Sequence, residues 1–331
     1  MQICYMRIFK KPPKFARLLS KTSKYYNIEV VYAHPENVDI EQEVIHGQVL
    51  IDNEWVEKDV PIPPYIDINT YCFRYKEEME FLKERSHLST NGMYGGKEKV
   101  YRLLEEDGEF ADLLIPSRRA GSFEDFATFI HEHHSIILKP RNGHKGQGIY
   151  LIEKDSQDYI LYHGNEEKTM SVGELKTFIE EMDDKYLWQK YITSTTPKGE
   201  PFDTRLRLEK NGKGGWQVTN YLVRIGAHQK VVANVAQGGC VSKLSPYLKA
   251  NFDNWEEVSE KIKTIGKELP YKIEELSNKR NIAMGIDLGI EQTGEIYLFE
   301  INSSPGTEFG ESELADIKPD YYNYILKQLQ G

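Results

Sequence analysis

Short apolar runs of strand length alternate along this chain with longer stretches of helical period. The early segment IEVVYA, residues 28–33, reads as a strand, and KEEMEFLKE, residues 76–84, reads as a helix. Pro61, Pro63 and Pro64 interrupt the pattern between them. The chain shows no internal repeat, and the alternation predicts a mixed α/β fold.

The second half continues the same alternation. Residues 171–182 predict a helix, because Ser171 can cap its start and Glu174 follows three positions later. Strand signals around residues 205–209 and 217–224 form a pair, and the charged stretch 255–280 has a helical pattern. We therefore expect a C-terminal unit that combines a sheet with a long helix.

The stretch MGIDLGIEQTGEIYLFEINSSPG sets carboxylate and amide side chains into two apolar runs. We expect a hairpin whose two-residue tip is Thr293 and Gly294. That register places Asp287 directly opposite Glu300, and Asn302 shares the face of Glu300. Two carboxylates that face each other repel, and burying them costs free energy, so a cation between them would offset both effects. Two carboxylates and an amide oxygen suit Mg²⁺ that also keeps waters and substrate phosphates as ligands. A solvated hairpin with acids at its edge is the alternative.

A glycine-rich loop joins the apolar runs SIILK and IYLIEK. It contains Gly143, Lys145, Gly146 and Gly148 and follows Lys139, which ends the first run. Glycine permits positive φ and has no side chain, so backbone N–H groups in such a loop can approach phosphate oxygens. The loop is not a P-loop, because no Lys-Ser/Thr follows its last glycine. An ordinary glycine-rich hairpin is the alternative, although a terminal lysine is more easily explained as a phosphate or nucleobase contact.

These two segments together resemble the ATP-grasp superfamily, from about residue 91 to the C-terminus. Lys97 sits where the superfamily has its first nucleotide lysine, with Lys99 as the competing choice, and Lys139 matches the second. The hairpin residues Asp287, Glu300 and Asn302 match its metal ligands in type and spacing.

The segment YLWQKYI is similar to the hinge between the lobes of ATP-grasp proteins. This similarity implies that the Gln189 side chain and the main chain of Lys190 and Ile192 bind the adenine edge.

Two regions are similar to the YheC/YheD group of endospore-coat-associated ATP-grasp proteins. One is the amino-terminal stretch HGQVLIDNEWVEKDVPIPPYI. The other carries residues in that group's order, namely Asp203, Arg205, Trp216, Arg224, Asn234 and the pair Gly238 and Gly239. The ending NSSPGTEFGE is closer to the glutamate ligase RimK, so ligation of an amino acid to a protein or peptide is an alternative function.

The resemblance implies an ATP-grasp fold of the α/β (α+β) class, with two lobes that enclose the nucleotide and a preceding mixed α/β N-terminal domain. We accordingly divide the chain into an N-terminal domain at residues 1–90, a small lobe with the glycine loop at 91–190, and a large lobe with the metal site at 191–331.

The family's chemistry implies an ATP-dependent ligase that joins a carboxylate to an amine through an acyl phosphate, with ATP and two Mg²⁺ ions as cofactors. Arg224 and Arg205 would stabilise the transferring phosphoryl group, and a surface ion pair is the alternative for both. Candidate substrate contacts are Asp203, Asn234, Gly238, Gly239, Ser303 and Ser304. The substrates would be a small molecule or peptide with a carboxylate and an amine acceptor. A coat or assembly protein that binds ATP without turnover is the alternative of a different class.

Composition adds a few exclusions. The formal net charge of −10 argues against a nucleic-acid partner. The three cysteines are far apart and odd in number, which fits a reducing compartment. No apolar run reaches membrane-spanning length and the first residues lack the apolar core of a signal peptide, so we expect a cytosolic or mother-cell location with no membrane partner.

Overall fold

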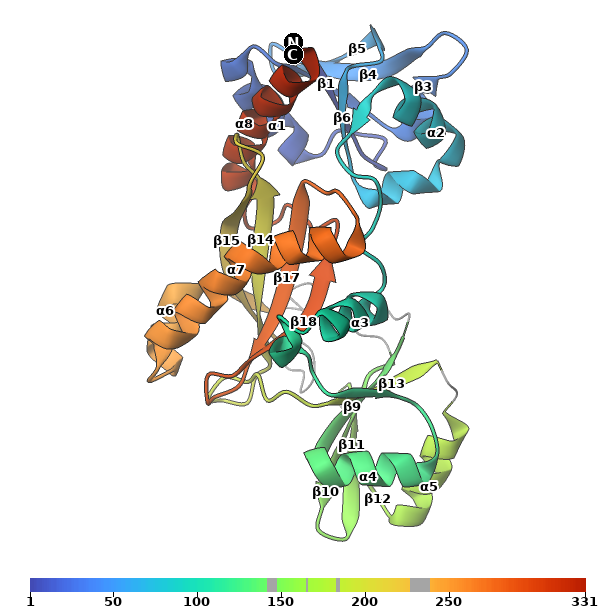
Figure 1. Cartoon of the computed structure of the whole chain (residues 1–331), viewed down its shortest axis with the longest axis vertical. Coiled ribbons are helices and arrows are strands. Elements are labelled where there is room, and N and C mark those ends of the chain that lie inside the picture. The colour runs from blue at the N-terminus through green and yellow to red at the C-terminus, as the bar shows by residue number, and fades with distance from the viewer. Residues whose placement is uncertain (142–147, 165, 183–184, 227–238) are drawn as a thin grey trace.

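The computed structural model describes residues 1–141, 148–164, 166–182, 185–226 and 239–331, apart from the side chain of Lys97. These residues form three sheets that follow one another along the length of the molecule, and both chain termini lie at one end (Figure 1).

The N-terminal sheet occupies that end. Its strands are β1 (Gln2–Met6), β2 (Glu29–Ala33), β3 (Val38–Asp39), β4 (Val44–Ile51), β5 (Glu54–Pro61), β6 (Tyr65–Ile68) and β7 (His87–Leu88), and its helices are α1 (Lys14–Ser23) and α2 (Lys76–Arg85). The strand order is β3-β4-β2-β1-β6-β7, with β5 paired to β4. The central strand β1 runs parallel to both β2 and β6 and is almost wholly buried, as parallel strands usually are.

The second sheet lies at the opposite end, after helix α3 (Lys97–Asp107). Its strands are β8 (Ser117–Arg119), β9 (Ser135–Pro140), β10 (Tyr150–Asp155), β11 (Asp158–His163), β12 (Glu166–Met170) and β13 (Tyr186–Lys190). They are ordered β12-β11-β10-β9-β13-β8. Helices α4 (Phe123–His133) and α5 (Val172–Glu181) pack on it through a core that includes Phe126, Leu175 and Trp188.

The third sheet lies between the other two (Figure 1). Its strands are β14 (Phe202–Lys210), β15 (Trp216–Ile225), β16 (Cys240–Lys243), β17 (Ala283–Ile290) and β18 (Ile296–Asn302), in the order β16-β15-β14-β17-β18. Helices α6 (Leu244–Asn251) and α7 (Trp255–Ser277) share its core. A Cβ on Gly266 of α7 would lie 2.8 Å from Val218 Cγ2, so glycine permits the close approach of this helix to the sheet.

Strand β14 shows how the sequence pattern builds the two faces of this sheet. In FDTRLRLEK the apolar and small residues from Phe202 to Leu208 are buried toward α7, as period-two alternation predicts. The intervening positions, Asp203, Arg205, Arg207 and Glu209, place a line of charges along the opposite face.

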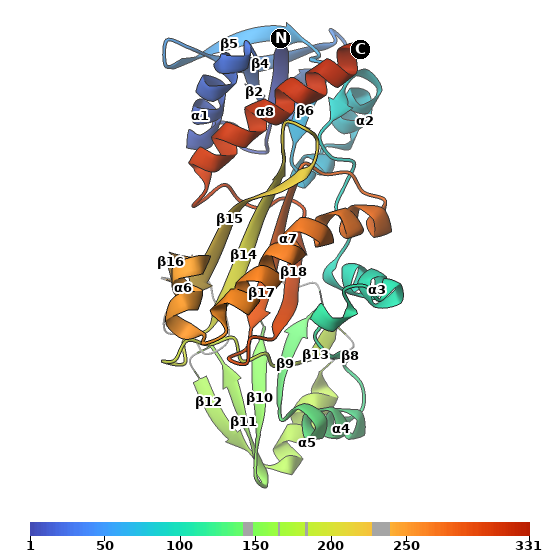
Figure 2. The same ribbon diagram turned by 60° about the vertical axis from the view of Figure 1, so that its left-hand side comes forward.

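The last helix, α8 (Glu311–Gln330), returns to the N-terminal sheet and lies beside α1 (Figure 2). Its residues Leu314, Tyr322 and Leu326 share a core with Phe15 and Tyr65. The two ends of the chain therefore fold against each other.

The predicted elements are confirmed in most respects. The strand at 28–33, the helix at 76–84 and the long helix at 255–280 correspond to β2, α2 and α7. Ser171 caps α5 in a reciprocal pair with Glu174, as its position predicts. Within the described ranges, no helix combines the length and apolar character needed to cross a membrane.

Candidate functional site

The paired carboxylates lie on the hairpin of β17 and β18. Asp287 is directly opposite Glu300, and Asn302 pairs with Gly285 at the end of the same ladder. The predicted pairing of the two acids is therefore confirmed.

The predicted hairpin tip is wrong, although the pairing is right. Glu291 N–H donates to the Glu295 carbonyl at 2.9 Å, so the turn encloses three residues, and Gly294 adopts φ +88°. A three-residue loop alone would shift the register by one, but a β-bulge between Asp287 and Leu288 restores it. The bulge is what sets the acids face to face.

Two arginines from neighbouring strands surround Asp287. Arg205 of β14 donates from Nε to Asp287 Oδ1 at 2.6 Å and from Nη2 to Oδ2 at 2.5 Å. Arg224 of β15 lies 3.1 Å from the same carboxylate and makes two 2.6 Å hydrogen bonds to Asp203. Bidentate contacts of this kind fix orientation as well as charge. The predicted arginines are thus part of one half-buried charge cluster with Asp287 and are not isolated surface ion pairs.

Burial and charge act in opposite directions on these acids. Burial favours the neutral form of Asp287, but Arg205 and Arg224 outweigh it and lower the pKa of this carboxyl. For Asp203 burial dominates despite Arg224 and raises the pKa to about 6. Asp287 is therefore held as a carboxylate.

The donor set fits a hard divalent cation. Asp287, Glu300 and Asn302 carry two carboxylates and an amide, a set of groups that suits Mg²⁺ completed by waters or phosphate oxygens. In this structure both Asp287 oxygens accept from Arg205, and Asn302 Nδ2 lies 3.5 Å from Asp287 Oδ2. In the part of the chain that the structure describes, no three His, Cys, Asp or Glu side chains form a metal-binding group.

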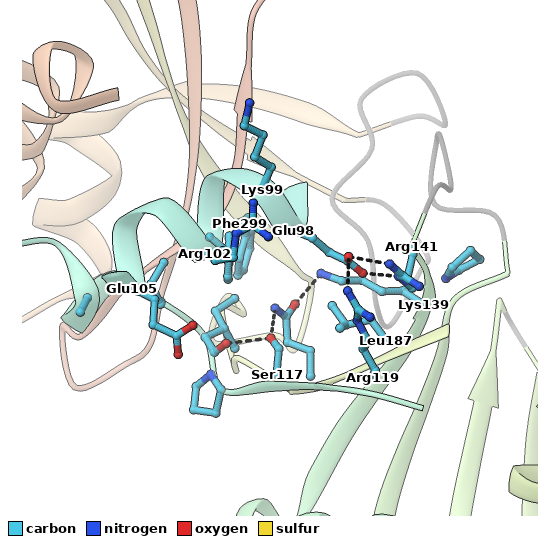
Figure 3. A pocket seen from close by; sticks show the side chains of 17 residues that line it. Glu98, Lys99, Arg102, Glu105, Ser117, Arg119, Lys139, Arg141, Leu187 and Phe299 are labelled. Atoms are coloured by element: carbon cyan, nitrogen blue, oxygen red, sulfur yellow. Dashed lines mark hydrogen bonds and ion pairs between the residues drawn. The ribbon is translucent and has the colours of Figure 1, made fainter. Parts of the chain in front are cut away.

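A pocket of about 650 Å³ lies between α3 and the edge of the second sheet, as Figure 3 shows. Lys139 of β9 donates to Gln189 Oε1 at 2.5 Å, and Gln189 donates to Ser117 Oγ at 2.8 Å. Phe299, the residue before Glu300, also lines this pocket. The structure therefore brings the predicted lysine and hinge glutamine together in one cavity next to the acidic hairpin.

Three charged residues of this pocket were missed by the sequence reasoning. Glu98 Oε2 accepts from Arg141 at 2.7 Å and from Arg119 at 3.5 Å (Figure 3). The hydrogen bond from Arg141 is the main cause of the lowered pKa of Glu98. Arg141 directly follows the KP that ends β9, so its position before the glycine loop was the available signal.

Of the two candidates for the first nucleotide lysine, the structure describes the side chain of only one. Lys99 lines the pocket, whereas Lys97 opens α3 and its side chain lies outside the description. Of the glycine loop, Gly148 is described at φ +70°, where a Cβ would lie 3.1 Å from Pro140 Cγ, so this position requires glycine. The predicted contacts Gly143, Lys145 and Gly146 lie outside the described residues.

The remaining hinge residues connect the sheets. Lys190 N–H donates to the Pro116 carbonyl at 2.9 Å, and its Nζ lies 3.7 Å from Glu291 in the β17–β18 turn. The Ile192 carbonyl accepts from Ser194 N–H at 2.8 Å. The described main chain at Lys190 and Ile192 thus already makes protein contacts, and adenine binding by these groups stays a prediction.

The predicted substrate residues are dispersed. Ser303 Oγ accepts from Tyr94 N–H at 3.1 Å, and Ser304 Oγ accepts from Thr70 N–H at 3.0 Å. These hydroxyls fasten the loop after β18 to preceding parts of the chain. Gly239 comes directly before β16, whereas Asn234 and Gly238 lie outside the described residues.

Comparison with known proteins agrees with this geometry. A family model described as YheC/D-like ATP-grasp matches residues 87–328. The endospore coat-associated protein YheD of Bacillus subtilis strain 168 is 25% identical over 284 residues, which cover 81% of this chain and 62% of YheD. YheC of the same strain is 24% identical over 321 residues, or 89% of this chain and 84% of YheC. The chain therefore spans less than two thirds of the length of YheD.

The fold is similar to that of the ATP-grasp ligase PsnB complexed with a minimal precursor, with a TM-score of 0.54 and 12% sequence identity. The superposition covers 99% of this chain and 99% of the PsnB chain. A likeness at this identity shows the fold alone. The predicted ATP-grasp fold is confirmed.

Proposed function

The chain belongs to the YheC/D-like ATP-grasp family, and from this premise we propose that it is an ATP-dependent carboxylate–amine ligase. The observation that carries the proposal is the Asp287–Glu300 pair, which two half-buried arginines flank. Phe299, next to Glu300 in the sequence, lines the pocket that Lys139 and Gln189 also line. Nucleotide-dependent phosphoryl transfer needs ligands for a metal ion, positively charged side chains that bind phosphate, and a side chain that hydrogen-bonds the nucleobase.

Each group has a role in this proposal. Lys139 and Lys99 would bind phosphate oxygens, and Gln189 would bind the adenine edge. Asp287, Glu300 and Asn302 would hold two Mg²⁺ ions. When bound, these ions would neutralise negative charge on the phosphates.

The arginines would act on the reacting groups. Arg224 and Arg205 would stabilise negative charge on the transferred phosphoryl group and on the tetrahedral intermediate. Asp203 would act as a positioning residue, because its two hydrogen bonds fix the Arg224 guanidinium.

The reaction would proceed in two transfers. A substrate carboxylate attacks the γ-phosphorus of ATP, the bond to the β-phosphate oxygen breaks, and ADP leaves. An amine then attacks the carbonyl carbon of the acyl phosphate, inorganic phosphate leaves, and the nitrogen loses a proton to give the amide.

The product pattern tests this proposal. Purified protein would be incubated with Mg²⁺, ATP, hydroxylamine and pools of amino acids and short peptides as carboxylate donors. Hydroxylamine should intercept an acyl phosphate, so a hydroxamate should form with equimolar ADP and phosphate. Release of AMP and pyrophosphate would instead show adenylation and contradict the proposal.

A second candidate function is favoured by the names of the relatives, both of which are endospore coat-associated. A non-catalytic ATP-binding protein of the coat or its assembly would bind nucleotide in the same pocket. Tight ATP binding without ADP release in any substrate pool would favour this candidate over the ligase.

A further inference from the structure

Five cationic and two acidic side chains line the pocket that holds Lys139 and Gln189. An excess of positive charge in a concave site attracts anions such as the phosphates of a nucleotide. One of the two acids, Glu98, nevertheless forms ion pairs with two of the five cations. The cations are Lys99, Arg102, Arg119, Lys139 and Arg141, and the acids are Glu98 and Glu105.

Three of these cations belong to one side of the second sheet. Strand β9 buries Leu138 in the core beneath α4 and α5, so period-two alternation places Lys139 on the opposite face. Arg141, two positions further on, lines the same pocket. Arg119 of β8 is opposite Leu187 of β13, which is opposite Lys139, and residues that are opposite in a ladder share a face of the sheet.

Glu98 reaches these cations from a different part of the fold. It lies in the first turn of α3, whose Val100 and Leu104 are buried in the core of the third sheet. Arg141 donates to both carboxylate oxygens of Glu98, from Nε to Oε1 and from Nη2 to Oε2 at 2.7 Å, and Arg119 Nη2 lies 3.5 Å from Oε2 (Figure 3). These ion pairs therefore join α3, which packs on the third sheet, to the second sheet across the pocket.

The Glu98 carboxylate and a phosphate group require the same donors. A guanidinium binds either anion through two parallel N–H groups, so Arg141 cannot make this bidentate contact with both at once. The hydrogen bond from Arg141 lowers the pKa of Glu98, so the acid is charged at neutral pH and repels an approaching phosphate.

Glu98 is also able to leave these donors. Its side chain is 33% exposed, so the displaced carboxylate can be hydrated instead of being buried without a partner. The triphosphate of ATP carries several negative charges against the single charge of Glu98, so it has the stronger attraction to the two arginines.

We propose that Glu98 competes with the phosphates of ATP for Arg141 and Arg119, so that nucleotide binding breaks the ion pairs between α3 and the second sheet. Arg141 is then a phosphate-binding residue, and Glu98 lowers the nucleotide affinity of the free protein. The identification of the competing anion as ATP rests on the proposed function, whereas the ion pairs are observed in the structure itself.

The test is a gain of affinity. Calorimetry with the full chain, Mg²⁺ and ATP should show that Glu98→Gln binds ATP about tenfold more tightly than the wild type, because the arginines are no longer occupied. The gain should be smaller for AMP, which has fewer phosphate groups, whereas a change in the shape of the pocket would affect both nucleotides alike. The control Glu80→Gln removes an exposed acid that pairs with Lys83 in α2, at the far end of the molecule, and should change neither affinity (Figure 1).

Arg141→Gln is the second variant and should weaken ATP binding about tenfold or more. Added to this variant, Glu98→Gln should give a much smaller gain than it gives in the wild type, since the donor for which Glu98 competes is absent.

Unchanged or weaker ATP binding by folded Glu98→Gln, or equal gains for ATP and AMP, would overturn the inference and leave the proposed function intact. If Glu98→Gln does not fold, unchanged ATP affinity in Arg141→Gln would overturn it on its own. Absence of ATP binding in the wild type would overturn the proposed function together with the inference.

Discussion

Glu300 lies opposite Asp287 in the strand ladder, so β17 and β18 would each contribute one carboxylate ligand to the proposed cation. Glu300→Gln removes one of the two carboxylates and keeps the shape of the side chain. We expect it to lower Mg²⁺-dependent ADP release by about a thousandfold, since a cation-bound phosphoryl group loses several kcal/mol of transition-state stabilisation. Thermal unfolding should stay close to that of the wild type.

The matched control for this change is Glu260→Gln on the exposed face of α7, where Glu260 pairs with Lys263 at 2.6 Å. Its activity should equal that of the wild type. Turnover of the Glu300 variant within tenfold of the control would remove Glu300 from the metal site.

Lys139 and Gln189 act as a unit because they share a 2.5 Å hydrogen bond in the pocket. Lys139→Ala should weaken ATP binding about tenfold or more, since a charge-assisted phosphate contact contributes roughly 1.5–3 kcal/mol. Gln189→Ala should reduce selectivity for adenine over guanine more than it reduces phosphate affinity. Calorimetry with ATP and GTP measures both effects.

Because the two side chains touch, their effects should not add. We expect the double variant to differ from the sum of the single variants by at least roughly 0.5 kcal/mol. Lys154→Ala, on the exposed end of β10, is the control and should leave ATP binding unchanged. Unaltered affinity in the Lys139 variant would exclude this lysine from nucleotide binding.

At the scale of elements, the β17–β18 turn determines whether the acids meet. Gly294 at φ +88° has no room for a Cβ, which would lie 2.5 Å from Asn254 Nδ2 and 2.9 Å from Val258 Cγ2. Gly294→Ala should therefore destabilise the protein by about 1–3 kcal/mol in chemical denaturation.

Gly173→Ala in α5 is the opposing control, because among the described residues the added Cβ would have no atom within 4 Å apart from its chain neighbours and the backbone of its own helix. Alanine favours a helix over glycine, so this variant should be as stable as the wild type or more stable by about 0.5–1 kcal/mol. Equal stability of the two variants would mean that the turn is not constrained as described.

At the scale of the whole molecule, Asp67 ties the two ends of the chain together. Its carboxylate contacts Arg7, which directly follows β1, and Lys318 of α8. Asp67→Asn leaves both cations buried without that charge, so the free energy of unfolding at pH 7 should fall by about 3–5 kcal/mol. Asp158→Asn on the exposed start of β11 is the control and should have little effect.

The same contact predicts a pH dependence. Burial opposes ionisation, but Arg7 and Lys318 outweigh it and lower the pKa of Asp67 from 3.8 to about 2. Because the folded pKa lies below the ordinary value, this stabilisation is complete above about pH 4 and is lost as the pH falls toward 2, an amount of roughly 2–3 kcal/mol. The stability difference between wild type and Asp67→Asn should narrow over this range, and a constant difference would contradict the assignment.

The sequence by itself determined those features that local pattern encodes. Period-two alternation in FDTRLRLEK fixed the two faces of β14, and Ser171 with Glu174 fixed the start of α5, because both depend on neighbours within a few residues. The spacing of Asp287, Glu300 and Asn302 predicted their common face, but the pairing of the two acids is right only because the β-bulge offsets the error in the predicted turn.

Only the tertiary structure decided what depends on contacts between distant segments. The pairing of Asp287 with Arg205 joins residues 82 positions apart, and the Asp67–Lys318 contact joins residues 251 positions apart. The β-bulge at Asp287 and the return of α8 to the N-terminal sheet are likewise decided by packing between elements. Local propensity carries no information about such pairs, because their energy comes from burying side chains that the linear sequence does not bring together.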